Sequence, residues 1–395
     1  MKNLPPAPSP VPHFHSLDGL RALPALAVLW CHSQLPNWRD WPLGFELTKK
    51  LHVLSLYDNM GHFAVNLFIV LSGFCLMLPV VRGDGSLRGG ATLFLKKRAV
   101  RILPPYFAAM ALSLLLLTVL IPQPTGTPWD ASLPVTKWDI LGNLFLLQNF
   151  LPHSGAINHA HWSISLEWWI YFLFPAFVVA IRLGTTWAAA LIVLASAVLV
   201  YLGITLFGQG FTLQYIGLFA MGMLGAKFAF SGHPRSQTFA RRVNWIPATL
   251  VLSVAVFLLS KYGVKLLGGH FGPPLVDYVV GLWAMCLLLV IALRQSPGLN
   301  HILSFRPLVF IGTFAYSIYL IHAPLIQIVW QYLLEPLELS PLPSYLLLKT
   351  IAPPLALLCA YLFYLLCERP FVRAKRHQPA KAQVFPQGTI STAIR

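Results

Sequence analysis

The chain has 395 residues, of which 57% are hydrophobic and only 10% are charged. A soluble globular protein carries about 25% charged residues, so this composition excludes that class and indicates an integral membrane protein. The formal net charge of +16 does not indicate nucleic-acid binding, because the basic residues lie in short connections between apolar runs, where they set topology beside anionic lipid.

Ten apolar runs are long enough to cross a bilayer as helices. They cover residues 20–35, 63–81, 102–121, 163–182, 187–207, 211–230, 246–267, 275–293, 309–334 and 345–367. A further run, 140–151, is too short to cross and is predicted to be interfacial or re-entrant. We therefore predict an all-α fold, a polytopic bundle of about ten spanning helices.

The connections between these runs predict the domain organisation and the orientation. Residues 1–16 are expected to form a cytoplasmic segment, 17–371 the transmembrane domain, and 372–395 a cytoplasmic, basic and disordered tail. With the N-terminus inside, most of the 28 Lys and Arg residues fall on the inner side, as the positive-inside rule requires. We expect the plasma (inner) membrane, with the long connections 36–62 and 122–161 outside.

The first apolar run carries Asp18 and Arg21 near its start and His32 near its end. Ionisable groups inside a membrane are costly and so indicate function. A helix would place Arg21 and His32 about 16 Å apart along its axis. Burial favours a neutral imidazole, and a neutral His32 near a hydroxyl is a natural general base for acyl transfer. The alternative is a histidine that only packs and hydrogen-bonds.

A basic cluster precedes the third run. Arg98 and Arg101 are three residues apart, so they share one face of a helix, where two guanidinium groups suit phosphate oxygens. The alternative is a flank that only sets topology. Because Arg101 lies at the edge of the apolar run and Arg21 is expected near the same membrane face, the three cations can converge at one cytoplasmic mouth.

Polar residues near the fourth run are the third candidate group. Glu167 lies about one turn inside that run and needs a His or Arg partner from another helix. His159 and His161 resemble a metal pair, but they lack further ligands at suitable spacing, and the five cysteines lie within apolar runs as small hydrophobes. No metal is expected.

The ninth run contains Tyr316, Tyr319 and His322. These side chains can orient a substrate or hold helices together. In the second run, Ser72 and Gly73 allow close packing or approach to a ligand, and at the end of the last run Glu368 can pair with Arg369.

Taken together, these stretches resemble the acyltransferase-3 family of membrane acyltransferases, which includes O-antigen acetylases. The matches, beside the Arg21-to-His32 spacing, are LDGLRA (17–22), LFIVLSGF (67–74), RAVRILP (98–104), WSISLE (162–167), YSIYLIH (316–322) and ERP (368–370). They occur in the family's order over almost the whole chain.

The resemblance implies transfer of an acyl group, usually acetyl, from cytoplasmic acyl-CoA to a hydroxyl of an extracytoplasmic or lipid-linked carbohydrate. It implies that His32 is catalytic with Arg21 in support. Arg98 and Arg101 are expected to contact the donor, and we add Ser72 to that site. The residues that match family positions with less certain roles are Glu167, Tyr316, Tyr319 and His322. Asn66 stands where many members have Asp, which removes a carboxylate from this predicted substrate site.

These interpretations combine into one mechanism. The phosphates of acyl-CoA bind Arg98 and Arg101, with Arg21 as a further candidate, and the pantetheine arm carries the thioester to His32. Glu167 either orients the imidazole or stabilises imidazolium. His32 either deprotonates the acceptor or carries the acyl group itself. The rival interpretations are a secondary transporter of a sugar or glycolipid with a His/Arg relay, and a non-catalytic membrane scaffold.

Overall fold

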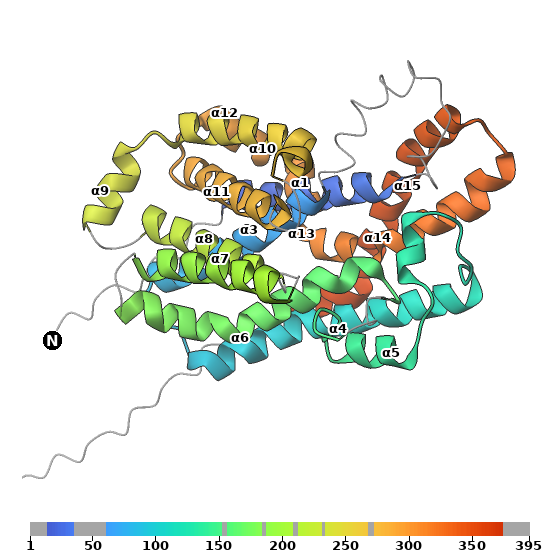
Figure 1. Ribbon diagram of the computed structural model, residues 1–395, viewed down its shortest axis with the longest axis horizontal. Helices are drawn as coiled ribbons and strands as arrows, with labels where there is room; N and C mark the ends of the chain where they lie inside the picture. The colour runs from blue at the N-terminus through green and yellow to red at the C-terminus, as the bar shows by residue number, and fades with distance from the viewer. Residues whose placement is uncertain are drawn as a thin grey trace, which may run out of the picture.

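The computed structural model describes residues 14–34, 61–151, 156–183, 187–207, 212–230, 234–267 and 272–373. These residues form helices and their connections, with no β-strand among them. The long helices lie side by side in one bundle (Figure 1). The all-α prediction is confirmed. The expectations for the N-terminal segment, most of the connection 36–62 and the tail fall outside the described residues.

The helices follow one another along the chain. They are α1 (His15–His32), α3 (Gly61–Val81), α4 (Gly90–Val119), α5 (Lys137–Leu144), α6 (Trp162–Leu183), α7 (Trp187–Phe207), α8 (Gln214–Phe230), α9 (Pro234–Arg242), α10 (Trp245–Leu267), α11 (Gly272–Ala292), α12 (Pro297–Leu303), α13 (Arg306–Thr313), α14 (Ala315–Val329), α15 (Pro341–Phe363) and α16 (Arg369–Arg373). Short 3₁₀ segments η1 (Pro128–Ser132), η2 (His159–His161) and η5 (Glu335–Leu337) and π-helical segments η4 (Trp330–Leu334) and η6 (Tyr364–Glu368) complete them.

Each of the expected apolar runs overlaps a helix. Within the described residues, seven helices are long and apolar enough to cross a membrane, so a count of ten stays a prediction. The expected single helix 309–334 is divided at Phe314, whose backbone (φ −122°, ψ 22°) leaves the helical region between α13 and α14. A continuous apolar run does not reveal such a break, because hydrophobicity is unchanged across it.

Close backbone contacts bring the central helices together. A Cβ added to Gly73 of α3 would lie 2.1 Å from the carbonyl oxygen of Phe219 in α8, and one added to Gly222 would lie 1.9 Å from that of Val70. Small residues therefore let these two helices touch. Gly73 therefore serves helix packing. The neighbouring Ser72 lines a cavity inside the bundle.

The segment after α4 forms a compact cap on one end of the bundle. The short helix α5 begins with a capping box between Thr136 and Asp139, which satisfies its first backbone donors. Its apolar side chains Trp138, Ile140 and Leu144 are exposed. A short helix with an exposed apolar face agrees with the prediction of an interfacial piece in 140–151.

Candidate active site

A cavity of about 280 Å³ lies between α1, α3, α4, α6, α13, α14 and η6. Seven of the residues singled out in the sequence line it: Arg21, Ser72, Arg98, Arg101, Glu167, Tyr316 and Tyr319. We call it the arginine cavity. The three guanidinium groups thus come together as expected from their positions, while their part in donor binding stays a prediction.

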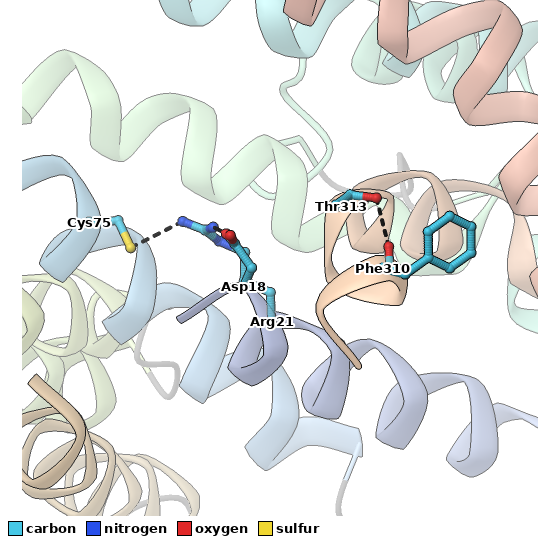
Figure 2. Close-up of polar contacts among 5 residues, drawn as sticks. All are labelled: Asp18, Arg21, Cys75, Phe310 and Thr313. Atoms are coloured by element: carbon cyan, nitrogen blue, oxygen red, sulfur yellow. Dashed lines mark hydrogen bonds and ion pairs between the residues drawn. The ribbon is translucent and has the colours of Figure 1, made fainter. Parts of the chain in front are cut away.

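Arg21 is held by a carboxylate on its own helix and a thiol on the next. It pairs with Asp18, one turn earlier on α1, and its Nη2 donates to Cys75 Sγ of α3 at 3.2 Å (Figure 2). Figure 2 also shows Thr313, which lines the same cavity and donates to the Phe310 carbonyl. Cys75 was expected only to pack, but its sulfur accepts a hydrogen bond from the Arg21 guanidinium.

Glu167 lies on the wall of the arginine cavity and has two hydroxyl partners. Its Oε1 accepts hydrogen bonds from Ser72 Oγ at 2.5 Å and from the Tyr171 hydroxyl. The Arg98 guanidinium carbon lies 5.9 Å from the centre of the Tyr171 ring. The expectation that Glu167 orients His32 is therefore corrected, because both hydroxyl donors hold the carboxylate in the arginine cavity.

Glu368 is a second carboxylate of this cavity. It is 2% exposed, lines the cavity and accepts a hydrogen bond from Ser317 Oγ at 2.6 Å. The sequence suggested a local pair with Arg369, and the described residues do not contain that pair. The signal that identifies Glu368 is the one used for Glu167, a carboxylate within an apolar run.

His32 lies at the other end of α1, and its hydrogen-bond partner is His322. His322 Nδ1 faces the carbonyl oxygens of Tyr319 at 2.8 Å and Ile318 at 3.1 Å. Carbonyls only accept, so Nδ1 of His322 carries its hydrogen. His322 Nε2, 2.9 Å from His32 Nδ1, then accepts from His32 when both rings are neutral. The lone pair of His32 is thereby assigned to Nε2.

A second, much smaller cavity adjoins His32. It measures about 10 Å³, and its lining includes His32, Trp129, His159, Gln327 and Trp330. The rings of His32 and His159 are 5.2 Å apart, and those of Trp129 and His159 are 6.1 Å apart. We call this the histidine pocket.

Tyr319 stands between the two cavities. It lines the arginine cavity, its hydroxyl accepts from Ser163 Oγ at 2.6 Å, and its ring is 5.8 Å from that of His322. The arginine cavity and the histidine pocket have no lining residue in common. The continuous passage from the cations to His32 that the predicted mechanism needs therefore stays a prediction, and Tyr319 is the side chain that lies between the arginine cavity and His322.

Asn66 belongs to neither cavity. It is fully buried, and its Nδ2 donates to Asp277 Oδ1 of α11 at 2.7 Å. His62 and Gln214 also contact the Asp277 carboxylate, at 2.7 and 3.3 Å. Sequence reasoning placed Asn66 with the substrate and missed Asp277, although a carboxylate in the run 275–293 meets the rule that identified Glu167.

Lys349 was also missed. It is 4% exposed, and its Nζ donates to the carbonyl oxygen of Trp30 at 2.6 Å, near the end of α1. A cation at a helix C-terminus stabilises the last carbonyl groups. Lys349 therefore fixes the turn that carries His32.

A family model described as an acyltransferase domain, that of the acyltransferase-3 family, matches residues 14–367. Acyltransferase MdmB of Streptomyces mycarofaciens is 26% identical over 348 positions, covering 81% of each chain. A Bacillus subtilis (strain 168) protein named "Putative peptidoglycan O-acetyltransferase YrhL" is 24% identical over 404 positions; the match covers 93% of this chain and 56% of that protein. No solved structure matches.

Proposed function

The chain belongs to the acyltransferase-3 family of membrane acyltransferases, and on that premise we propose that it moves an acetyl group from acetyl-CoA to a carbohydrate hydroxyl across the membrane. The observation that carries the proposal is the presence of a cationic cavity at one end of α1 and a hydrogen-bonded histidine pair at the other.

The arginine cavity supports the assignment of the donor site. Arg21, Arg98 and Arg101 present three permanently charged groups, of which Arg101 is exposed at the cavity edge. Guanidinium groups bind phosphate oxygens in paired, charge-assisted contacts. Acetyl-CoA has three phosphate groups and a long, largely uncharged arm, so it suits a site in which cations are followed by aromatic and aliphatic walls.

The histidine pair supports base catalysis. In the proposed step, His32 Nε2 takes the proton of the acceptor hydroxyl while the hydroxyl oxygen bonds to the thioester carbonyl carbon. The carbonyl oxygen becomes an oxyanion, then the carbon–sulfur bond breaks and the CoA sulfur receives the proton from His32. The products are the ester and free CoA, and His32 returns to its starting form.

Tyr319 has a defined part in this proposal. The thioester reaches His32 only when the Tyr319 ring moves from its place beside His322. The hydroxyl contact with Ser163 is a single hydrogen bond of about 1 kcal/mol, and the ring also packs against Phe68 and His322, so binding of the pantetheine arm has to offset both. Tyr319 thus acts as the inner wall of the reaction site.

The test is acetyl transfer by the full-length protein in lipid vesicles. Acetyl-labelled CoA is supplied on the side of the arginine cavity, with glycan fragments on the other side; peptidoglycan fragments are included because of the name of one relative. Covalent label on the glycan with release of free CoA is the expected result. Movement of unmodified sugar without label would support a transporter instead. If the protein neither labels the glycan nor moves the sugar, the acyltransferase proposal is overturned.

A further inference from the structure

Three nitrogen atoms that line the histidine pocket are buried without a hydrogen-bond partner among the described residues. They are Nε1 of Trp129, Nε2 of His159 and Nε1 of Trp330. Trp129 is only 2% exposed. An unsatisfied buried polar group costs about 1–3 kcal/mol, so three in one small space call for an explanation.

All three nitrogens are donors. The indole nitrogen of tryptophan can only donate. For His159, Ser132 Oγ accepts from the His159 backbone N–H at 3.0 Å and lies 3.0 Å from its Nδ1. Ser132 Oγ has no other partner among the described residues, so Nδ1 is the acceptor available to its hydroxyl hydrogen. That arrangement places the imidazole hydrogen on Nε2. Three residues that line the pocket together with His32 therefore each carry a buried N–H group without a partner among the described residues.

The other polar side chains in this pocket contrast with these three. Thr127 Oγ1 donates to Gln327 Oε1 at 2.6 Å, and Gln327 Nε2 donates to Thr125 Oγ1 at 2.9 Å. Their hydrogen bonds are made inside the protein, so the pocket wall is able to satisfy polar groups. The N–H groups of Trp129, His159 and Trp330 are therefore available to donate to an acceptor atom of a bound molecule.

The segments that carry these donors are held firmly. The Ile157 N–H donates to the Ser132 carbonyl at 3.0 Å and so ties η2 to η1, and Asn158 Nδ2 donates to the Leu320 carbonyl of α14 at 3.2 Å. Ile157 has φ +80°, a strained conformation for a β-branched residue that persists only where its surroundings fix it. Donors on such a support keep their positions during a reaction.

The size of the pocket limits what the donors can hold. About 10 Å³ is roughly the space of one water-sized group, too small for a sugar ring. We infer that Trp129, His159 and Trp330 bind the carbonyl oxygen of the thioester and stabilise it as it becomes an oxyanion.

This inference rests on the proposed acetyl transfer and adds the group that stabilises its intermediate. While the acceptor oxygen bonds to the carbonyl carbon, the electron pair of the C=O bond moves to the oxygen, and the three N–H groups donate to it. The pair returns when the carbon–sulfur bond breaks. Preorganised donors aimed at developing charge are a large source of rate enhancement.

The experiment measures kcat and KM of the full-length protein in lipid with acetyl-CoA and a glycan acceptor. Trp129→Phe and Trp330→Phe each remove one N–H and keep an aromatic ring. We expect kcat to fall by about 100-fold for each, with the KM values of both substrates unchanged. Trp138→Phe is the matched control, because Trp138 is 58% exposed on α5, and it should leave kcat unchanged.

A second pair of variants covers the case in which a tryptophan variant does not fold. His159→Gln keeps an N–H donor and should retain more activity than His159→Leu, while both bind acetyl-CoA as the parent protein does. Unchanged kcat in an active protein, equal loss in the two His159 variants, or an effect confined to the acceptor KM would overturn this inference alone. A parent protein that transfers no acetyl would overturn it together with the proposed function.

Discussion

The arginine cavity and the histidine pocket differ in size and in kind. The first is about 280 Å³ and combines cations with two carboxylates, whereas the second is about 10 Å³ and is lined by imidazole and indole rings. A large charged space suits recognition of a charged molecule, and a small space with fixed donors suits a change of bonds at one atom. In the proposed function, binding and chemistry are therefore divided between the two ends of α1.

Removing the base should give the largest effect. His32→Ala takes away the lone pair at Nε2, so kcat for acetyl transfer should fall by roughly 100- to 10,000-fold, while the affinity for acetyl-CoA stays at the parent value. Radiolabel transfer and isothermal titration measure the two quantities. The control is His301→Ala on α12, an exposed histidine. Loss of donor affinity in His32→Ala would break the division between the two cavities.

The opposite result is expected at the arginine cavity. Arg98→Ala combined with Arg101→Ala should weaken acetyl-CoA binding by about 100-fold, because each charge-assisted hydrogen bond contributes about 1.5–3 kcal/mol. At saturating donor, kcat should change little. The matched control is Lys96→Ala combined with Lys97→Ala, because both lysines are exposed on the same helix. A double arginine variant that binds the donor normally and loses kcat would reverse the assignment.

A smaller effect is expected from the partner of the base. His322→Leu removes the acceptor that holds the hydrogen on His32 Nδ1, and we expect kcat to fall by about 10-fold, as for the loss of one hydrogen bond. His322→Gln supplies a carbonyl oxygen at a similar place and should recover part of the rate. Equal activity of the Leu and Gln variants would show that His322 only fills space.

The smallest effect on activity is expected from Asn66. Asn66→Ala removes a donor to the buried Asp277 carboxylate, so the free energy of unfolding should fall by about 1–3 kcal/mol. Because Asn66 lines neither cavity, donor affinity and kcat should remain within about twofold of the parent values, since groups without shared contacts act independently. A raised KM for the glycan would return Asn66 to the substrate site, where sequence reasoning had put it.

The sequence predicted the convergence of the positively charged groups of the site well. Arg21, Arg98 and Arg101 stand out because cations are rare in apolar runs, and the helices that carry them bring them into one cavity. The same physical rule applied to Asp277 and Lys349 would have predicted two further polar contacts. The fold class followed from the length and composition of the runs.

Pairing between helices was the part that the sequence did not predict. Glu167 was assigned to His32, and the structure gives His32 the partner His322 instead. Spacing along a helix fixes height and face, but it does not fix how one helix is rotated against another. Trp129 and Trp330 went unnoticed for a different reason, because tryptophans near the ends of apolar runs are typical of the aromatic belt at the membrane surface.

The position of Tyr319 between the arginine cavity and His322 bears on the energy economy of a cell that makes this protein. An open water-filled duct from one membrane face to the other would conduct protons and dissipate the gradient that drives ATP synthesis. The Tyr319 ring lies beside His322 and lines the arginine cavity, so it stands between that cavity and the histidine pair. In the proposed transfer the acyl group crosses by covalent hand-over, and a ring in this position would keep the bilayer electrically sealed around it.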